Sequence, residues 1–163
     1  MRNIVCAVLL VVWLCSVLPA QPQCSSQSMR GNWSMSLLGW AIPKAEGTWG
    51  AAGQTLPIVG LGVASIDHAG KMTGPGAHVL AGLAFDWEMT GTVEVNSDCT
   101  GLMKYSMKIK GFPNLPGLLI ERFVLDPVRQ EMVSVSIQSP ISKPMWVATW
   151  KRTSPVPAPV AWP

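Results

Sequence analysis

The chain has 163 residues, of which 48% are hydrophobic and only 13% are charged, and it contains 15 Gly and 14 Pro. This length suits one domain. The low charge and the many turn-forming residues argue against coiled coils, helical bundles and charged disordered chains, and they favour an all-β fold. The net charge is only +3 and the basic residues are scattered, which argues against a nucleic-acid-binding protein.

The N-terminal residues 1–20 predict a secretory signal peptide. Arg2 is followed by an apolar run over 4–18 and then by Pro19 and Ala20, which is the order of charge, apolar stretch and break found in such signals. The alternative is a transmembrane anchor, but a spanning helix needs roughly 20 apolar residues. We therefore expect cleavage near Ala20, no transmembrane segment after cleavage, and a secreted or periplasmic protein.

Two of the four cysteines, Cys24 and Cys99, follow the predicted cleavage site. An even pair in an oxidising compartment most simply predicts one disulfide. A metal site would need further ligands, and only His68 and His78 are available. A nucleophilic cysteine would leave its partner without a role. We expect the disulfide, no metal site and no cofactor.

After a polar, flexible lead-in over 21–28, the first strong strand pattern covers 31–42. Apolar side chains alternate with polar ones there, which is typical of a strand with one buried face. The buried residues of this strand would be Trp33, Met35 and Leu37.

The next part of the chain is rich in small residues. We expect a loop over 43–57, a strand over 59–67 and a tight turn over 68–70. The segment 71–76 begins a return strand that breaks quickly. Residues 78–87 fit either a strand or one short helical turn, and their neighbours favour the strand.

The clearest hairpin covers 90–110. Strands over 90–95 and 102–110 flank the turn 96–101, whose Asn, Asp and Gly residues suit positive φ angles or local hydrogen bonds. In the second strand, lysines 104, 108 and 110 lie on the presumed solvent side. The opposite face would present Met103, Tyr105, Met107 and Ile109.

Three further strands are predicted before a Pro-rich C-terminal tail over 153–163. The strand over 118–125 leads through the turn 126–130 to a strand over 131–139, with the inward residues Val133, Val135 and Ile137. The last strand covers 145–152, with one face formed by Trp146, Ala148 and Trp150. The dense prolines that follow predict a flexible end.

These patterns predict about eight strands, short loops and no long helix. Sequential antiparallel strands in that number are most economically closed into a barrel, which removes the exposed sheet edges. We therefore expect an all-β chain with a single antiparallel up-and-down β-barrel domain over 29–152. The interior of such a barrel holds side chains or one small ligand.

Four stretches of the sequence carry a resemblance to known proteins. Gly31-Asn32-Trp33 resembles the opening Gly-x-Trp signature of lipocalin and other calycin barrels, and CSSQSMRGNW over 24–33 resembles the start of avidin-like barrels. The resemblance implies that Gly31 and Trp33 close the barrel base and that Arg152 covers the tryptophan. GVASIDHAGKMTG, GTVEVNSDCTG and ATWKR are similar to segments of small exported bacterial proteins of unknown function, which implies a calycin-like fold and an exported location.

No motif has a catalytic signature, so we expect no catalytic residue. His68 lies in a predicted turn, and no Gly-x-Ser-x-Gly elbow occurs. The carboxylates of Asp86, Glu88 and Glu94 fall on one exposed strand face, where solvation is expected.

The tryptophans and methionines favour a non-enzymatic protein that binds a small apolar ligand inside the barrel. The candidate lining residues are Trp33, Met35, Met103, Tyr105, Met107, Trp146 and Trp150. The alternative is a packed barrel that acts as a surface interaction or structural protein through an exposed Trp49, Trp87 and the tail. An enzyme is the third hypothesis. The ligand, the oligomeric state and the biological process stay open.

Overall fold

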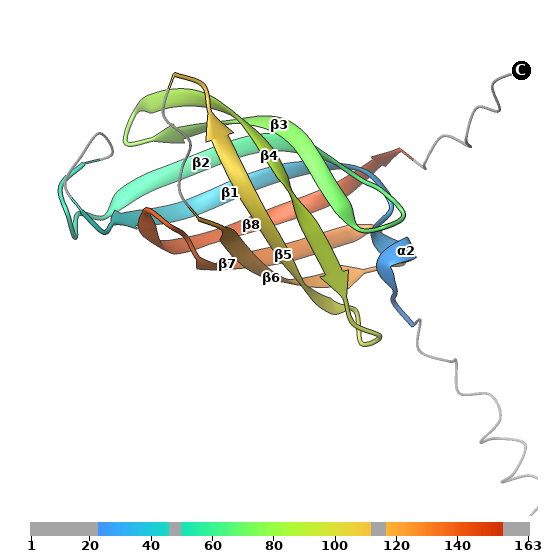
Figure 1. Cartoon of the computed structure of the whole chain (residues 1–163). Helices are drawn as coiled ribbons and strands as arrows, with labels where there is room; N and C mark the ends of the chain where they lie inside the picture. The colour runs from blue at the N-terminus through green and yellow to red at the C-terminus, as the bar shows by residue number, and fades with distance from the viewer. Residues whose placement is uncertain (1–22, 46–49, 112–116, 155–163) are drawn as a thin grey trace, which may run out of the picture.

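In the computed structural model, which describes residues 23–45, 50–111 and 117–154, eight antiparallel strands follow one another around a closed barrel (Figure 1). This confirms the predicted fold class. A short helix, α2 (Ser26–Met29), precedes the barrel at one end. The strands are β1 (Gly31–Pro43), β2 (Leu56–Ile66), β3 (Lys71–Leu80), β4 (Leu83–Val95), β5 (Thr100–Ile109), β6 (Leu119–Asp126), β7 (Glu131–Gln138) and β8 (Ser142–Ser154).

The barrel closes where β8 pairs with β1. Met35 lies opposite Trp150, and Leu37 lies opposite Ala148. All four side chains are buried, because directly opposed residues of neighbouring strands share one face of the sheet. The predicted inward faces of β1, β5 and β8 are therefore confirmed. The predicted signal peptide, Trp49 and residues 155–163 of the tail lie outside the described residues.

The strand β7 faces the opposite way from our prediction. Val133, Val135 and Ile137 are about half exposed, whereas the alternate residues Met132, Ser134 and Ser136 are buried. Register explains this result, because each β7 residue must share a face with its partners on both neighbouring strands. The small serines fit a barrel interior that already holds bulky tryptophans from β8. The local hydrophobicity of β7 therefore predicted the wrong face of this strand as the buried one.

The ambiguous region 78–87 contains a hairpin turn that we did not predict. β3 continues unbroken to Leu80, and β4 begins at Leu83. The two loop residues, Ala81 and Gly82, have φ angles of 50° and 85°. Positive φ at both positions is the requirement of the type I′ turn, which matches the twist of two-residue hairpins.

Trp87 is buried rather than exposed, which corrects the expectation that it is a surface contact. It lies on the inward face of β4, and its ring rests on Gly62 and Gly76 of the two preceding strands. A Cβ atom at Gly76 would come within 2.1 Å of the ring. These glycines therefore provide the space that a large aromatic side chain needs inside a narrow barrel.

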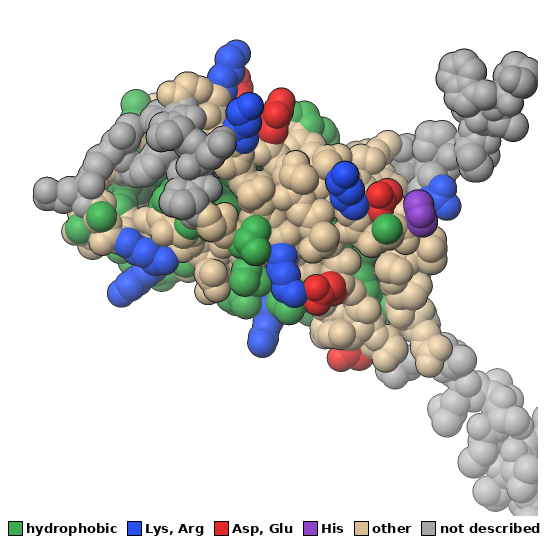
Figure 2. Space-filling model, in the orientation of Figure 1, with side chains coloured by type: hydrophobic (Ala, Val, Ile, Leu, Met, Phe, Trp, Pro, Cys, Tyr) green, Lys and Arg blue, Asp and Glu red, His purple; other side chains and the backbone are tan. Residues whose placement is uncertain are grey.

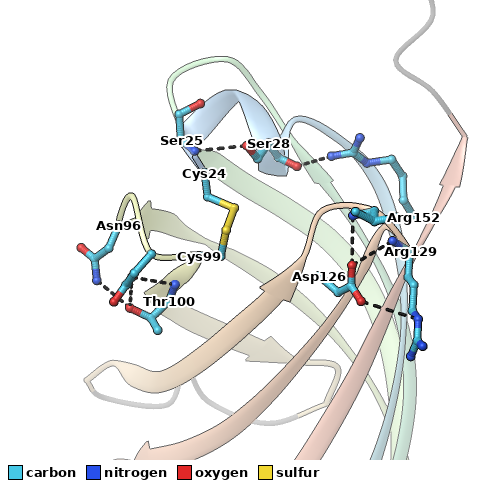
Figure 3. The surroundings of a disulfide bond; sticks show 11 residues. Cys24, Ser25, Ser28, Asn96, Cys99, Thr100, Asp126, Arg129 and Arg152 are labelled. Atoms are coloured by element: carbon cyan, nitrogen blue, oxygen red, sulfur yellow. Dashed lines mark hydrogen bonds and ion pairs between the residues drawn. A yellow bond between two sulfur atoms is a disulfide. The ribbon is translucent and has the colours of Figure 1, made fainter. Parts of the chain in front are cut away.

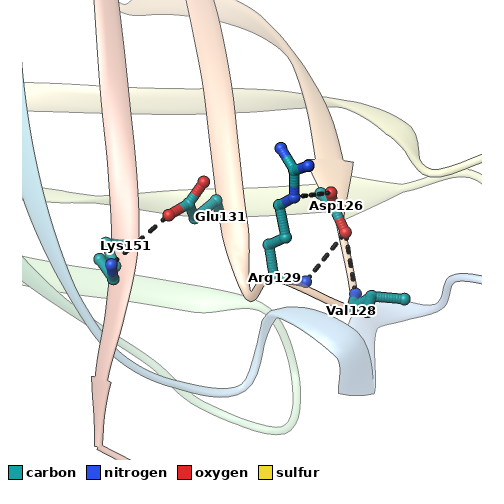
Figure 4. Close-up of polar contacts among 5 residues, drawn as sticks. All are labelled: Asp126, Val128, Arg129, Glu131 and Lys151. Atoms are coloured by element: carbon teal, nitrogen blue, oxygen red, sulfur yellow. Dashed lines mark hydrogen bonds and ion pairs between the residues drawn. The ribbon is translucent and has the colours of Figure 1, made fainter.

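Aspartates fix two of the predicted turns. Oδ1 of Asp67 accepts a 2.9 Å hydrogen bond from the backbone N–H of Lys71. Oδ1 of Asp126 accepts 3.0 Å bonds from the backbone N–H groups of Val128 and Arg129 (Figure 4). Short side chains that bond their own backbone in this way favour turns over strands.

Candidate functional site

One end of the barrel, the α2 end, is covered by the helix. The indole N–H of Trp33 donates a 2.7 Å hydrogen bond to the carbonyl oxygen of Met29 in α2. The guanidinium carbon of Arg152 lies 4.9 Å from the Trp33 ring centre, and its Nη2 donates to the carbonyl oxygen of Ser28 (Figure 3). Partial burial lowers the pKa of Arg152. Trp33 and Arg152 thus belong to a packed closure, and Gly31 begins β1 beside it.

A disulfide between Cys24 and Cys99 holds the segment before α2 against the β4–β5 turn (Figure 3). The backbone N–H of Cys24 also donates to the carbonyl oxygen of Ser97 at 3.2 Å. In the same turn, hydrogen bonds from Thr100 lower the pKa of Asp98. The predicted disulfide is therefore present, and it belongs to the α2 end.

A buried carboxylate, Glu121 on β6, lies inside the barrel and is fully shielded from solvent. Its Oε1 accepts hydrogen bonds from Tyr105 Oη at 2.6 Å and from Trp146 Nε1 at 3.3 Å. Its Oε2 accepts from Ser134 Oγ at 2.6 Å, and that hydroxyl accepts from Trp150 Nε1 at 3.0 Å. Four strands are thereby joined by one interior hydrogen-bond network.

Tyr105 remains a neutral donor in this network. Its burial, and then the charge and hydrogen bonding of Glu121, hold the pKa of Tyr105 well above its ordinary value. A buried carboxylate is tolerated only where its oxygens are hydrogen-bonded. The network thus satisfies a polar group that the apolar core would otherwise reject.

The barrel end opposite α2, here called the mouth, contains a cavity of about 50 Å³. Its wall is mostly apolar, and the polar side chains in it include His78, Tyr105 and Ser142. Tyr105 and Trp146 line the cavity and also bind Glu121, so the interior network lies beneath its floor. The apolar lining includes Leu37, Ala41, Ile58, Leu80, Phe85, Met107, Ile109 and Leu119.

His78 is the unusual residue of the mouth. It is only 7% exposed, and its Nε2 has no hydrogen-bond partner among the described residues. Burial lowers its pKa to about 4, so the imidazole is neutral at physiological pH. The ring packs on Gly60, where a Cβ would lie 2.0 Å from it, and contacts the Phe85 ring edge-on. His78 thus contributes a neutral ring to a mostly apolar wall, and its Nε2 is shielded from solvent beside Gly60.

The cavity is lined by three of the seven candidate ligand-binding residues, namely Tyr105, Met107 and Trp146. The other four are buried but do not line it: Trp33, Met35, Met103 and Trp150. Trp33 packs against α2 and Trp150 bonds Ser134. The candidate set is thus divided between a packed interior and a cavity at the opposite end.

Sequence reasoning missed His78 and Glu121 as interior residues. The alternation along β6 could have placed Glu121, because Leu119, Phe123 and Leu125 lie on the same face and are buried. His78 gave a weaker signal, since its place depends on the Ala81–Gly82 turn. His68, by contrast, is exposed in its turn, as are Asp86, Glu88 and Glu94 on β4.

Within the described ranges, no group of three or more His, Cys, Asp or Glu side chains could hold a metal ion. No described helix has the length and apolar character needed to cross a membrane. The chain matches no protein-family model, and comparison with curated proteins and with solved structures found no similar protein.

Proposed function

We propose that this chain is an exported, non-enzymatic barrel that binds a small apolar ligand in its mouth. The observation that carries the proposal is the apolar cavity, whose lining includes the polar residues His78, Tyr105 and Ser142. Concave apolar sites with a few placed polar groups are the usual form of small-molecule sites. Export is supported by the N-terminal sequence pattern and by the Cys24–Cys99 disulfide, which is stable in oxidising compartments.

The size of the cavity narrows the ligand class. An apolar cavity of about 150 Å³ holds benzene, and this one measures about 50 Å³. It accepts a short aliphatic group, while the rest of a longer ligand would extend out of the mouth. A hydroxyl group suits the polar part of the lining, because the hydroxyl of Ser142 and a neutral imidazole such as that of His78 donate or accept hydrogen bonds, and a ligand hydroxyl does both. We therefore propose short-chain alcohols as the ligand class.

The direct test uses 1-butanol and 1-hexanol as probes. Binding would change tryptophan fluorescence, because Trp146 lines the cavity, and would raise the melting temperature by mass action. Leu80→Trp fills the mouth and should abolish both responses. Met103→Leu, a volume-conserving change in the packed interior away from the cavity, is the control and should retain them. A wild-type protein that responds to neither probe contradicts the proposal.

A packed barrel that acts through its surface is the second candidate. It is favoured by the filled interior, where Trp33, Met103 and Trp150 are each no more than 1% exposed. The same probes separate the two functions. A packed barrel gives no change in fluorescence or melting temperature with either alcohol. In that case Leu80→Trp adds only the emission of the new tryptophan and changes no response.

A further inference from the structure

One half of the outer barrel surface carries an unusual number of exposed apolar side chains. They come from β7, β8, β1 and β2, which are consecutive neighbours around the barrel. Eight of them, 43–69% exposed, form what we call the apolar stripe: Leu38, Trp40, Val59, Leu61, Val135, Ile137, Met145 and Val147. The inverted facing of β7 is part of this feature, because it turns aliphatic residues outward.

Strand register places these residues side by side. Leu38 lies directly opposite Val59 on one neighbouring strand and opposite Val147 on the other. Val147 in turn lies opposite Val135, so an unbroken aliphatic row crosses four strands. Trp40 lies opposite Met145 in the next outward row. Directly opposed side chains on one face are in contact distance, so these six residues form a continuous patch. Leu61 and Ile137 extend it, because they follow Val59 and Val135 by two positions on the same outward faces.

The stripe is also free of charge over most of its length. The strands β1 and β2 contain no charged residue, and β8 contains none between Lys143 and Lys151. At the α2 end, Lys151 pairs with Glu131 at 3.5 Å (Figure 4). The outward faces of β4 and β5 differ sharply, since they carry acidic residues and lysines such as the Glu94–Lys104 ion pair. Figure 2 shows these charged side chains on the β4–β5 side.

The exposed area is that of a protein interface. The exposed fractions of these eight residues add up to just over four fully exposed side chains. At roughly 150 Å² for each, the lower end of the range for large side chains, the stripe presents on the order of 650 Å². The largest apolar patch on a typical monomer is about 300–600 Å². A stable interface of standard size buries about 800 Å² from each partner. The stripe is therefore at or slightly above the upper end of the monomer range, and its area approaches one side of a dimer interface of standard size.

We propose that two copies of this chain associate through their apolar stripes around a two-fold axis. An isologous interface brings the same patch of both subunits together, so it must not repel itself. The stripe meets this condition because its centre is uncharged, whereas the chain as a whole carries a net charge of +3. This inference is independent of any ligand in the mouth, which opens at the end of the barrel rather than on its side.

The oligomeric state of the full-length exported protein tests the proposal. Sedimentation equilibrium should give a dimer at micromolar concentration, and the dimer should persist in about 1 M NaCl because apolar contacts are not screened. Leu38→Lys combined with Val147→Lys places two positive charges on directly opposed residues of the stripe. This double variant should be a monomer. The matched control is Thr90→Lys with Ser106→Lys, an opposed exposed pair on β4 and β5, which should remain dimeric.

A milder variant keeps the test decisive if the lysine pair does not fold. Leu38→Ala with Val147→Ala shortens the same exposed side chains and should weaken the dimer by at least about tenfold. A wild-type monomer, or a dimer that survives both stripe variants or dissociates in salt, would overturn the proposal. A monomer that co-sediments with phosphatidylcholine vesicles would assign the stripe to a lipid surface instead.

Discussion

The hydroxyl group of Tyr105 donates a 2.6 Å hydrogen bond to Oε1 of Glu121, which joins β5 to β6 inside the barrel. Both side chains are buried, and Glu121 has no exposed surface. Bulk water therefore cannot replace the bond when the tyrosine hydroxyl is removed, and only the longer bond from Trp146 Nε1 remains on Oε1. The loss of the bond therefore lowers the free energy of unfolding.

Tyr105→Phe should lower the free energy of unfolding by about 1.5–3 kcal/mol, the range for hydrogen bonds to charged groups. Urea unfolding measures this free energy. The slope of the free energy against urea concentration should be the same as in wild type. The same substitution in a Glu121→Leu background should cost clearly less, because the acceptor is already absent. Equal costs in both backgrounds would show that the bond does not stabilise the barrel.

His78 should make the barrel sensitive to acid. Its folded pKa of about 4 lies below its unfolded value of 6.5. Between these values the unfolded chain binds the proton and the folded chain does not, so stability is complete above pH 6.5 and falls towards pH 4. At about 1.4 kcal/mol per pKa unit, the loss amounts to about 3 kcal/mol.

Urea unfolding of wild type and His78→Phe at neutral and acidic pH isolates this contribution. The variant should lose less stability on acidification, because it lacks the titrating group. His68→Gln, in an exposed turn, is the control and should follow the wild-type profile. Parallel profiles for wild type and His78→Phe would refute the assignment.

The disulfide should contribute substantially to stability. It joins residues separated by 75 positions, and the chain-entropy model gives about 4 kcal/mol for closing a loop of that size. Cys24→Ser with Cys99→Ser should lower the free energy of unfolding by about this amount while the far-UV circular dichroism stays that of a β-protein. Reduced wild type should match the variant, and a smaller loss in either would point to residual structure in the unfolded chain.

The Ala81–Gly82 turn offers a stabilising substitution. Alanine at a φ of 50° has a steric cost that asparagine largely avoids. Ala81→Asn should therefore raise the free energy of unfolding by about 0.5–1 kcal/mol. Gly82→Ala, at a φ of 85°, should act in the opposite direction, and a thermal melt of the two variants checks both signs.

The sequence was sufficient to predict the fold class and the disulfide. Alternation indicated the buried faces of β1, β5 and β8 correctly. In β5 and in the first half of β1, apolar residues occupy every second position and mostly polar ones lie between them, and in β8 the two tryptophans Trp146 and Trp150 mark the buried face. In β7 the local pattern of hydrophobicity does not identify the buried face. Its valines are more hydrophobic than its serines, yet the serines lie inside, where Ser134 binds Glu121.

The candidate site depended more strongly on long-range pairing. Met103 and Met107 share one face of β5, but only Met107 reaches the mouth, because position along a strand decides which end of the barrel a side chain lines. Trp87 was expected at the surface, and the cross-strand glycines Gly62 and Gly76 give it room inside. Such contacts join residues from different strands, so a local pattern does not contain them.

The sequence by itself determined the strands, because a period of two in hydrophobicity is a local property of the chain. Only the tertiary structure decided what those strands enclose and what they leave outside. Closing the barrel fixes one register for all eight strands at once, and that register buries Glu121 and His78 and turns Val135 outward. Whether a particular residue is buried depends on the residues that pair with it on the two neighbouring strands. The closure of the barrel determines which residues these are.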